Sequence, residues 1–371
     1  MVELSPLLSP FSLGRLTVRN RVVMAPMTRE MSPGGVPGPD VRDYYARRAR
    51  GGVGLIITEG ASVDLAGSFG SRVPRLYGRD AIAAWREVVS AVHDEGAAIF
   101  AQLWHVGAFS PSLIGMVDTL PADVARLSPS GLAAPDRPFG RAMTEADIAH
   151  AVAAFAAAAA AAQDAGFDGI EVHGAHGYLP DQFMWEGTNL RDDRYGGTIE
   201  ARMHFPVELV EAIRRRTGNG FVIGFRLSQW KQLDYAARLA PDPDTLALYV
   251  RPLAEAGVDV FHASTRRFWE PEFPGDPRNL AGWVRALGGR PVITVGSVTL
   301  DVDFKAPSGK LAAKAQLDHL AMLEDGLARQ HFDLIAIGRS LLANPDWVHR
   351  LERSALAGLE AFDRTMIDKL N

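Results

Sequence analysis

Short apolar runs alternate with longer amphipathic stretches along most of the chain. The runs are rich in Val, Ile and Leu and several end in glycine, which is typical of buried strands in a parallel sheet covered by helices. The pattern predicts strands at residues 20–29, 54–60, 98–105, 169–173, 221–227, 258–262, 291–297 and 332–339. It predicts helices at residues 41–50, 80–95, 144–165, 199–216, 244–256, 280–287 and 316–330, with further helical residues to about 356.

Eight strand–helix alternations fit a closed (β/α)8 barrel, so we expect an α/β protein in which residues 1–371 form a single TIM-barrel domain. A small hairpin is expected at residues 11–18, before the first strand. Residues 106–142 follow the third strand, hold several prolines and show little periodicity, and we interpret them as a long lid or substrate loop. Residues 301–313 are expected to be an insertion, and Thr144 is expected to cap the helix after the long loop.

The composition narrows the class of protein. A net charge of -5 and a pI near 6.1, without runs of like charge, argue against a nucleic-acid partner. The absence of cysteine excludes disulfides, thiolate nucleophiles and Cys-ligated metal centres. The first residues show no signal peptide, and the alanine-rich run at 151–162 is too short to cross a bilayer. We therefore expect a cytoplasmic protein with no membrane partner.

A cluster of potentially catalytic side chains lies just past the fourth predicted strand, where His173, His176 and Tyr178 follow each other between glycines. In parallel α/β folds, the carboxyl ends of the strands carry the active site. The alternative is that these are structural histidines and a packing tyrosine. Three such side chains within six positions, separated by Gly174 and Gly177, favour a chemical role.

The other predicted strand ends also carry polar or small residues: Pro26, Met27, Thr28, Gly60, Gln102, Trp104, Arg226, Ser264, Thr265, Arg266, Gly296, Ser297, Gly338 and Arg339. The last two pairs, Gly296–Ser297 and Gly338–Arg339, follow strands seven and eight. In TIM barrels these positions commonly form a phosphate site from backbone N–H groups. The guanidinium of Arg339 can bind a phosphate through two parallel hydrogen bonds.

The chain resembles the old yellow enzyme family of FMN-dependent ene-reductases over roughly residues 7–350. The resemblance is carried, in order along the barrel, by the segments 20–29, 58–60, 102–105, 169–179, 189–191, 194–197, 224–228 and 336–339. Two positions depart from the family pattern: Ala108 stands where many relatives carry Arg, and Gln229 stands where Pro is common. The lack of cysteine argues against the iron–sulfur dienoyl-reductase branch and the branch with Cys beside the flavin.

The resemblance implies non-covalently bound FMN as cofactor and NADPH or NADH as reductant. The implied cofactor contacts are Pro26, Met27, Thr28, Gly60, Gln102, Arg226, Gly296, Ser297, Gly338 and Arg339. Thr28 would bond the C4 carbonyl region, Gln102 the pyrimidine edge, and Arg226 the N1 and O2 side, where it would stabilise the negative charge of reduced flavin. Gly296, Gly338 and Arg339 would hold the phosphate.

The resemblance also implies a small enone-type substrate. His173 and His176 would bind its carbonyl oxygen, Tyr178 would donate a proton, Trp104 would shape the pocket, and Trp269 would join it from the loop after strand six. The chemistry agrees with these roles. Hydride transfer needs a cofactor, two imidazole donors can stabilise a developing enolate, and a phenol with a pKa near 10 stays protonated at neutral pH.

Two other functions remain open. A metal-dependent hydrolase on the same barrel would use His105, His173 and His176 with Asp181 or Glu171, since histidine clusters at barrel rims bind zinc. A non-enzymatic flavin-binding protein would leave the histidines and the tyrosine idle. We expect the ene-reductase, with no metal site. The physiological substrate, the choice between NADPH and NADH, the oligomeric state and the stereochemical outcome do not follow from the sequence.

Overall fold

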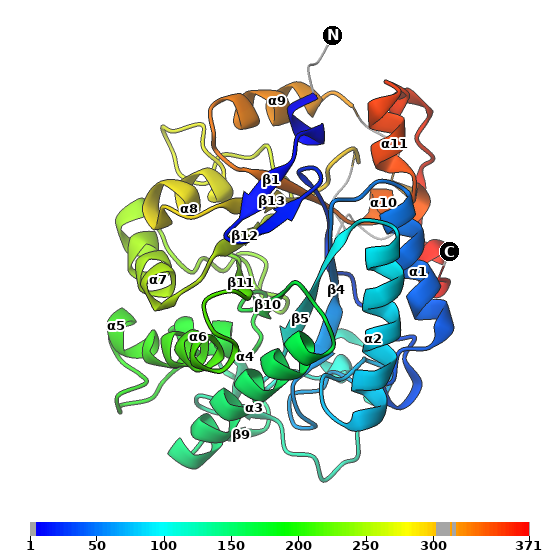
Figure 1. Cartoon of the computed structure of the whole chain (residues 1–371). Helices are drawn as coiled ribbons and strands as arrows, with labels where there is room; N and C mark the ends of the chain where they lie inside the picture. The colour runs from blue at the N-terminus through cyan, green and yellow to red at the C-terminus, as the bar shows by residue number, and fades with distance from the viewer. Residues whose placement is uncertain (1–4, 302–311, 314–316, 371) are drawn as a thin grey trace.

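Eight parallel strands close into a barrel in the computed structural model, which describes residues 5–301, 312–313 and 317–370 (Figure 1). The barrel strands are β3 (Val22–Met24), β4 (Leu55–Ser62), β5 (Ala98–Trp104), β10 (Gly169–His173), β11 (Val222–Leu227), β12 (Val260–Ser264), β13 (Val292–Val295) and β15 (Leu334–Ile337). Each pairs in parallel with the next barrel strand along the chain, and β15 closes the barrel by pairing with β3. The predicted fold class is confirmed.

Helices surround the strands (Figure 1). They are α1 (Pro39–Arg50), α2 (Arg79–Asp94), α3 (Glu145–Asp164), α4 (Leu179–Met184), α5 (Ile199–Arg202), α6 (His204–Thr217), α7 (Pro243–Ala256), α8 (Leu280–Gly288), α9 (Leu320–Ala328), α10 (Arg339–Ala343) and α11 (Trp347–Glu352). Most elements lie within their predicted ranges but several are shorter: the first strand, expected at 20–29, spans only Val22–Met24, and the helix expected at 316–330 spans Leu320–Ala328. Two further boundaries also differ. The helix expected at 199–216 is divided at Met203, and the sixth strand begins at Val260 rather than at 258.

The helix α3 begins with the expected cap at Thr144, whose side chain accepts from the backbone N–H of Asp147 while the Asp147 carboxylate accepts from that of Thr144. Among the described residues, one helix, α3, is long and apolar enough to cross a membrane if only length and composition are considered. In the structure, however, its buried face, which includes Ile148 and Phe155, packs against α6, β5 and β10. That packing is the one expected of a barrel helix.

The hairpin β1 (Phe11–Leu13) and β2 (Leu16–Val18) forms as predicted and lies across one end of the barrel, in dark blue in Figure 1. Leu13 and Val18 are buried there among inward-facing residues such as Leu55, Val222 and Val260. Because these contacts lie at the amino ends of the strands, that end is closed. The carboxyl ends of the strands are therefore the end of the barrel at which an active site can lie.

The long segment after β5 folds over the carboxyl ends with local structure of its own. It contains the 3-10 helix η3 (Pro111–Ile114) and the short strands β6 (Leu127–Ser128), β7 (Leu132–Ala134), β8 (Arg137–Pro138) and β9 (Arg141–Ala142). The buried Arg126 holds it in place through the Asp118 carboxylate, 2.9 Å away, and the Ser68 carbonyl, 2.5 Å away.

Most of the expected insertion at 301–313 lies outside the described residues. At its end, β14 (Ala312–Ala313) pairs antiparallel with β16 (Phe362–Asp363) near the C-terminus. The 3-10 helix η5 (Arg364–Asp368) follows β16. The remaining 3-10 helices are η1 (Ser5–Leu8), η2 (Pro33–Gly35) and η4 (Leu356–Gly358).

Candidate active site

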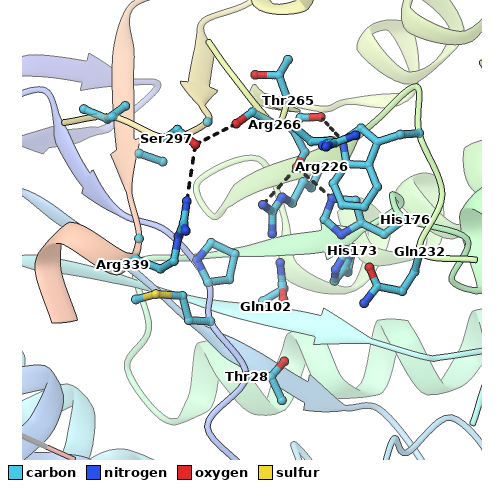
Figure 2. Close-up of a pocket in the computed structure, with 18 of the residues that line it drawn as sticks. Thr28, Gln102, His173, His176, Arg226, Gln232, Thr265, Arg266, Ser297 and Arg339 are labelled. Carbon is cyan, nitrogen blue, oxygen red and sulfur yellow. Dashed lines mark hydrogen bonds between the residues drawn. The ribbon is translucent and has the colours of Figure 1, made fainter. Parts of the chain in front are cut away.

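A cavity of about 340 Å³ lies at the carboxyl ends of the barrel strands. Most of the residues that the sequence singled out line it: Pro26, Met27, Thr28, Gln102, Trp104, His173, His176, Tyr178, Arg226, Gly296, Ser297, Gly338 and Arg339. In Figure 2, Arg339 stands on one side, His173, His176 and Gln232 stand on the other, and Gln102 lies between them. The structure therefore brings residues from distant parts of the chain into one site.

Two predicted residues are not brought into this cavity. Gly60, in β4, does not line it, and a Cβ atom at that position would lie 2.5 Å from the Trp104 ring. The absence of a side chain at Gly60 therefore leaves room for the Trp104 ring. Trp269 lines a different pocket, where its ring stacks on His319 with 3.6 Å between centroids. The expected role of Trp269 in the active-site pocket finds no support in this position.

The turn after β10 orients the two histidines and the tyrosine. Gly174 is required there because a side chain would overlap the Phe225 ring, and His176 adopts a left-handed φ of 66°. His173 lies with its ring centroid 5.0 Å from that of His176 and 4.8 Å from that of Tyr178. The three side chains thus converge on the same wall of the cavity.

The protonation states of these groups follow from their burial. Burial lowers the pKa of His173 and of His176 well below the usual value, and the nearby Arg226 charge lowers both further. Burial raises the pKa of the Tyr178 phenol. At neutral pH the wall therefore presents two neutral imidazoles, which can each donate one N–H, and one protonated phenol.

His176 is fixed by two neighbours that sequence reasoning did not identify together. Its Nε2 atom lies 2.8 Å from Ser264 Oγ, and its ring stacks on Trp230 with 4.1 Å between centroids. Ser264 Oγ also accepts from the Arg226 guanidinium over 3.1 Å. Ser264 therefore couples the position of His176 to that of Arg226.

Gln102 is held from behind by a buried network. Its Nε2 donates to Glu171 Oε1 over 2.7 Å, and His262 Nδ1 lies 2.7 Å from the other oxygen of Glu171. Burial by itself would raise the pKa of Glu171, but His262 and Arg226 outweigh that effect, so the pKa is lowered. The ionised Glu171 accepts from the amide nitrogen of Gln102 and so fixes the orientation of that side chain.

The charges lining the cavity fit an anionic cofactor. Arg226, Arg266 and Arg339 line it, and no carboxylate does among the residues described there. The Nε atom of Arg226 is buried without a hydrogen-bond partner in the described protein. Such an unpaired donor suits an acceptor atom of a bound ligand.

The Arg339 side of the cavity also fits a phosphate. Ser297 Oγ lies between Arg339 Nη2, at 3.4 Å, and the Arg266 carbonyl, at 3.1 Å. Gly296 has a φ of 141°, and a Cβ atom there would lie 2.8–2.9 Å from Thr265 and the Arg266 backbone. Glycine therefore lets two backbone segments approach each other beside the guanidinium. The residues present fit FMN: Arg339 would hold its phosphate, and Arg226 would lie by its flavin ring.

Sequence reasoning missed the loop after β11. Trp230 and Gln232 line the cavity, and the backbone N–H of Gln232 donates to the His176 carbonyl over 2.9 Å. Between them, Lys231 is fully buried, and its Nζ lies 2.5 Å from Asp181 Oδ1. A lysine flanked by apolar and amide residues past a strand end carries no distinct signal in a single sequence. Its partner is 50 residues away along the chain.

The structure gives no support to the metal-dependent alternative. Within the part of the chain that is described, no group of three or more His, Asp and Glu side chains is arranged to hold a metal ion. His105 does not line the cavity, and the two candidate carboxylates have other partners, Lys231 for Asp181 and His262 for Glu171.

Comparisons with known proteins agree with this site. Residues 6–356 match the model of the NADH:flavin oxidoreductase / NADH oxidase family. The chain is 34% identical to putative 12-oxophytodienoate reductase 3 of Oryza sativa subsp. japonica, over 94% of this chain and 86% of that protein. It is 33% identical to 12-oxophytodienoate reductase 2 of Arabidopsis thaliana, over 94% of this chain and 89% of that protein.

Solved structures show the same likeness. A structure of morphinone reductase in complex with tetrahydroNAD superposes with a TM-score of 0.80 at 29% identity, covering 97% of this chain and 93% of that one. An old yellow enzyme homologue from Zymomonas mobilis gives a TM-score of 0.76 at 27% identity, covering 94% of this chain and 93% of that one. The chain belongs to the NADH:flavin oxidoreductase / NADH oxidase family, the old yellow enzyme family, and is an FMN-dependent ene-reductase that takes its electrons from a nicotinamide cofactor.

Proposed function

We propose that this enzyme reduces the C=C bond of small α,β-unsaturated carbonyl compounds, with His173 and His176 binding the carbonyl oxygen and Tyr178 protonating Cα. Bound FMN supplies the hydride, which it receives from NADPH or NADH. The observation that carries the proposal is the convergence of two neutral imidazoles and a protonated phenol on one wall of the cavity, across from Arg339.

The two histidines would act through charge stabilisation. Negative charge builds on the carbonyl oxygen when hydride adds to Cβ, and N–H donors aimed at that oxygen stabilise the charge. Because both imidazoles are already neutral donors, they give no proton away in this step. Ser264 and Trp230 hold His176 in place, so the donor is oriented before the substrate binds.

Tyr178 would supply the proton that completes the reduction. Its ring packs against Trp104 and Phe109, at 5.1 and 5.4 Å between centroids, which limits its movement. Because its pKa is raised, the phenol remains an acid across the neutral and mildly alkaline range. The relatives named as reductases of 12-oxophytodienoate and of morphinone support a small organic substrate of this kind.

The histidine roles can be tested with phenols on the purified holoenzyme. A phenolate bound over oxidised flavin should give a long-wavelength charge-transfer band, and His173→Ala or His176→Ala should weaken it and slow reduction of 2-cyclohexenone. The control is His150→Ala, since His150 is exposed on α3 with 74% of its side chain accessible. An unchanged phenol titration in both active-site variants would contradict the proposed binding of the carbonyl oxygen by the two histidines.

We also propose that the chain works as a single barrel domain in the cytoplasm. The packing of α3 against the barrel supports a protein that lies outside the membrane. Fractionation of cells that express the protein should place it with soluble markers. Recovery in the membrane fraction would contradict the proposal, and light scattering of the purified protein would give its oligomeric state.

A further inference from the structure

A groove of about 540 Å³ lies between α8 and the end of α9, in the helical layer that surrounds the barrel (Figure 1). It is lined by Arg278, Gly282, Arg285, Ala286, Gly289, Arg329, Gln330 and His331. None of these residues lines the active-site cavity. The groove is therefore separate from the site described above, and we call it the arginine groove.

Three guanidinium groups line the arginine groove, and no carboxylate does among the residues described there. Each is held by an aspartate that does not line the groove: Arg278 by Asp276 at 2.7 Å, Arg285 by Asp333 at 2.5 Å, and Arg329 by Asp325 at 2.7 Å. Among the described contacts, Arg285 is bound through Nη1 alone and Arg329 through Nε alone, so most of their N–H donors remain for a ligand.

The aspartates also decide which kind of anion fits the arginine groove. They balance the charge of the three arginines, so a single negative charge gains little there. A chain of phosphates can instead accept from several ordered guanidinium N–H groups at once, each through a charge-assisted hydrogen bond. The arginine groove therefore suits a polyphosphate rather than a simple anion.

An aromatic pocket of about 310 Å³ adjoins the arginine groove, since His331 lines both. The other residues that line the pocket are mostly apolar: Phe268, Trp269, Pro277, Asn279, Ala321, Met322, Asp325, Gly326 and Phe332. Phe268 and Trp269 meet edge to face, with 5.3 Å between centroids. Aromatic walls of this kind suit a planar ring such as a nucleobase.

His331 lies where the pocket and the groove meet. A Cβ atom at Gly282, in α8, would lie 3.0 Å from Arg278 Cβ and 3.3 Å from His331 Cβ, so the glycine lets these two side chains approach α8 closely. Burial lowers the pKa of His331, and the Arg329 charge lowers it further. The imidazole is therefore neutral at neutral pH and can either donate to or accept from a sugar hydroxyl placed between the groove and the pocket.

We propose that the arginine groove and the aromatic pocket together bind a nucleoside triphosphate, with its phosphates on Arg285 and Arg329 and its base in the pocket. Asp325 lines the pocket and accepts from Arg329 through Oδ1, and its Oδ2 has no hydrogen-bond partner among the described contacts. That oxygen can accept from an exocyclic amine, which favours adenine over uracil. The inference goes beyond the proposed reaction, because the active-site cavity shares no lining residue with the groove or the pocket.

The first experiment is calorimetric titration of the oxidised holoenzyme with ATP, UTP, inorganic triphosphate and adenosine. ATP should bind with one molecule per chain and more tightly than the other three probes, because it alone fills both the groove and the pocket with matching groups. Its affinity should fall as NaCl is added, since the phosphate contacts are made between charges near the surface. The titration requires no turnover and so does not depend on the reduction of any enone.

The second experiment uses variants of the groove and the pocket. Arg329→Ala should weaken ATP binding by about tenfold, the size expected for one hydrogen bond to a charged group. The matched control is Arg215→Ala, because both arginines are exposed and pair with a carboxylate four residues earlier in a helix. Met322→Asp should weaken ATP binding more than triphosphate binding, since Met322 lines only the pocket. Its control is Leu248→Asp, at a similarly exposed apolar residue on α7.

Four results would overturn the proposal. The first is that neither ATP nor triphosphate binds at millimolar concentration. The second is that ATP is displaced by an active-site phenol and binds Arg329→Ala as tightly as the wild type, because the nucleotide then occupies the active site. The third is that Arg329→Ala raises KM for NADPH by the factor by which it weakens ATP binding, because the groove then serves the reductant. The fourth is that triphosphate binds as tightly as ATP, because the pocket then holds no base.

Discussion

The buried ion pair between Asp181 and Lys231 allows a sharp prediction about stability. The Asp181 side chain is 0% exposed and that of Lys231 is 1% exposed, and 2.5 Å separates their charged atoms. Burial raises the pKa of Asp181 and lowers that of Lys231, so each group is ionised mainly because of the other. Asp181→Asn leaves the lysine charge buried without a counter-ion.

Removing one partner of such a pair typically costs about 3–5 kcal/mol. For a chain of this size, with roughly 2 °C lost per kcal/mol, the melting temperature should fall by roughly 6–10 °C. Urea unfolding of the holoenzyme, followed by flavin fluorescence, measures the change in the free energy of unfolding. A thermal scan measures the change in melting temperature. The control is Glu211→Gln, which breaks an exposed ion pair with Arg215 and should cost less than about 0.5 kcal/mol.

The double variant Asp181→Asn/Lys231→Met tests the reason for the loss. It removes both charges, so it should recover most of the stability that the single variant loses. The pair also holds the loop that carries Trp230 and Gln232 against the turn that carries His176, since Asp181 also accepts from the Gly177 N–H over 2.7 Å. Asp181→Asn should therefore weaken phenol binding as well. The reasoning fails if the single variant is within about 1 kcal/mol of the wild type, or if the double variant is the less stable of the two.

Three further predictions follow from single residues. Arg339→Ala should lower the flavin content of the purified protein by removing a charge-assisted phosphate contact, and heat should release the remaining flavin as FMN; recovered FAD would contradict this. Tyr178→Phe should slow the oxidative half-reaction with a cyclic enone by roughly 10²–10⁴-fold and leave reduction by NADPH near the wild-type rate in stopped-flow traces; equal effects on both steps would refute the proton-donor role. Burial raises the pKa of Glu59 to about 7 from 4.5, so folding favours the protonated form and stability falls as pH rises between these values. Glu59→Gln should therefore be more stable than the wild type by roughly 3 kcal/mol at pH 8 and equal to it near pH 4, as measured by urea unfolding.

The barrel could be predicted from the sequence because its signal is local. Apolar strands and amphipathic helices each show their own period, and their alternation specifies the architecture. Two of the boundary differences have side-chain causes. Pro206 has no N–H for the Arg202 carbonyl, so α5 ends and α6 starts anew. The Asp259 carboxylate accepts from the Ile223 N–H and from Arg214, so the sixth strand begins only after it.

The site could be predicted only where the fold itself brings residues together. Strand ends meet at one rim in any parallel barrel, so Thr28, Arg226 and Arg339 could be placed near each other in advance. Trp230 and the Lys231–Asp181 pair depend on how a loop folds back, which no local pattern encodes. Trp269 depends in the same way on loop packing, and in the structure its ring stacks on His319.

The electrostatics of the cavity explain how one arginine can serve two opposite needs. Arg226 cannot lose its proton under ordinary conditions, so its charge remains available to an anionic cofactor. The same charge adds to burial in lowering the pKa of His173 and His176, which keeps these proposed substrate anchors neutral. If either imidazole were protonated beside Arg226, two cations would share a buried space, and the nearby Glu171 carboxylate is already bound by His262 and Gln102. Neutral donors avoid that cost and still stabilise negative charge when it develops on the substrate oxygen. In the proposed reaction, one cavity would thus provide a permanent cation for the cofactor and uncharged donors for the substrate.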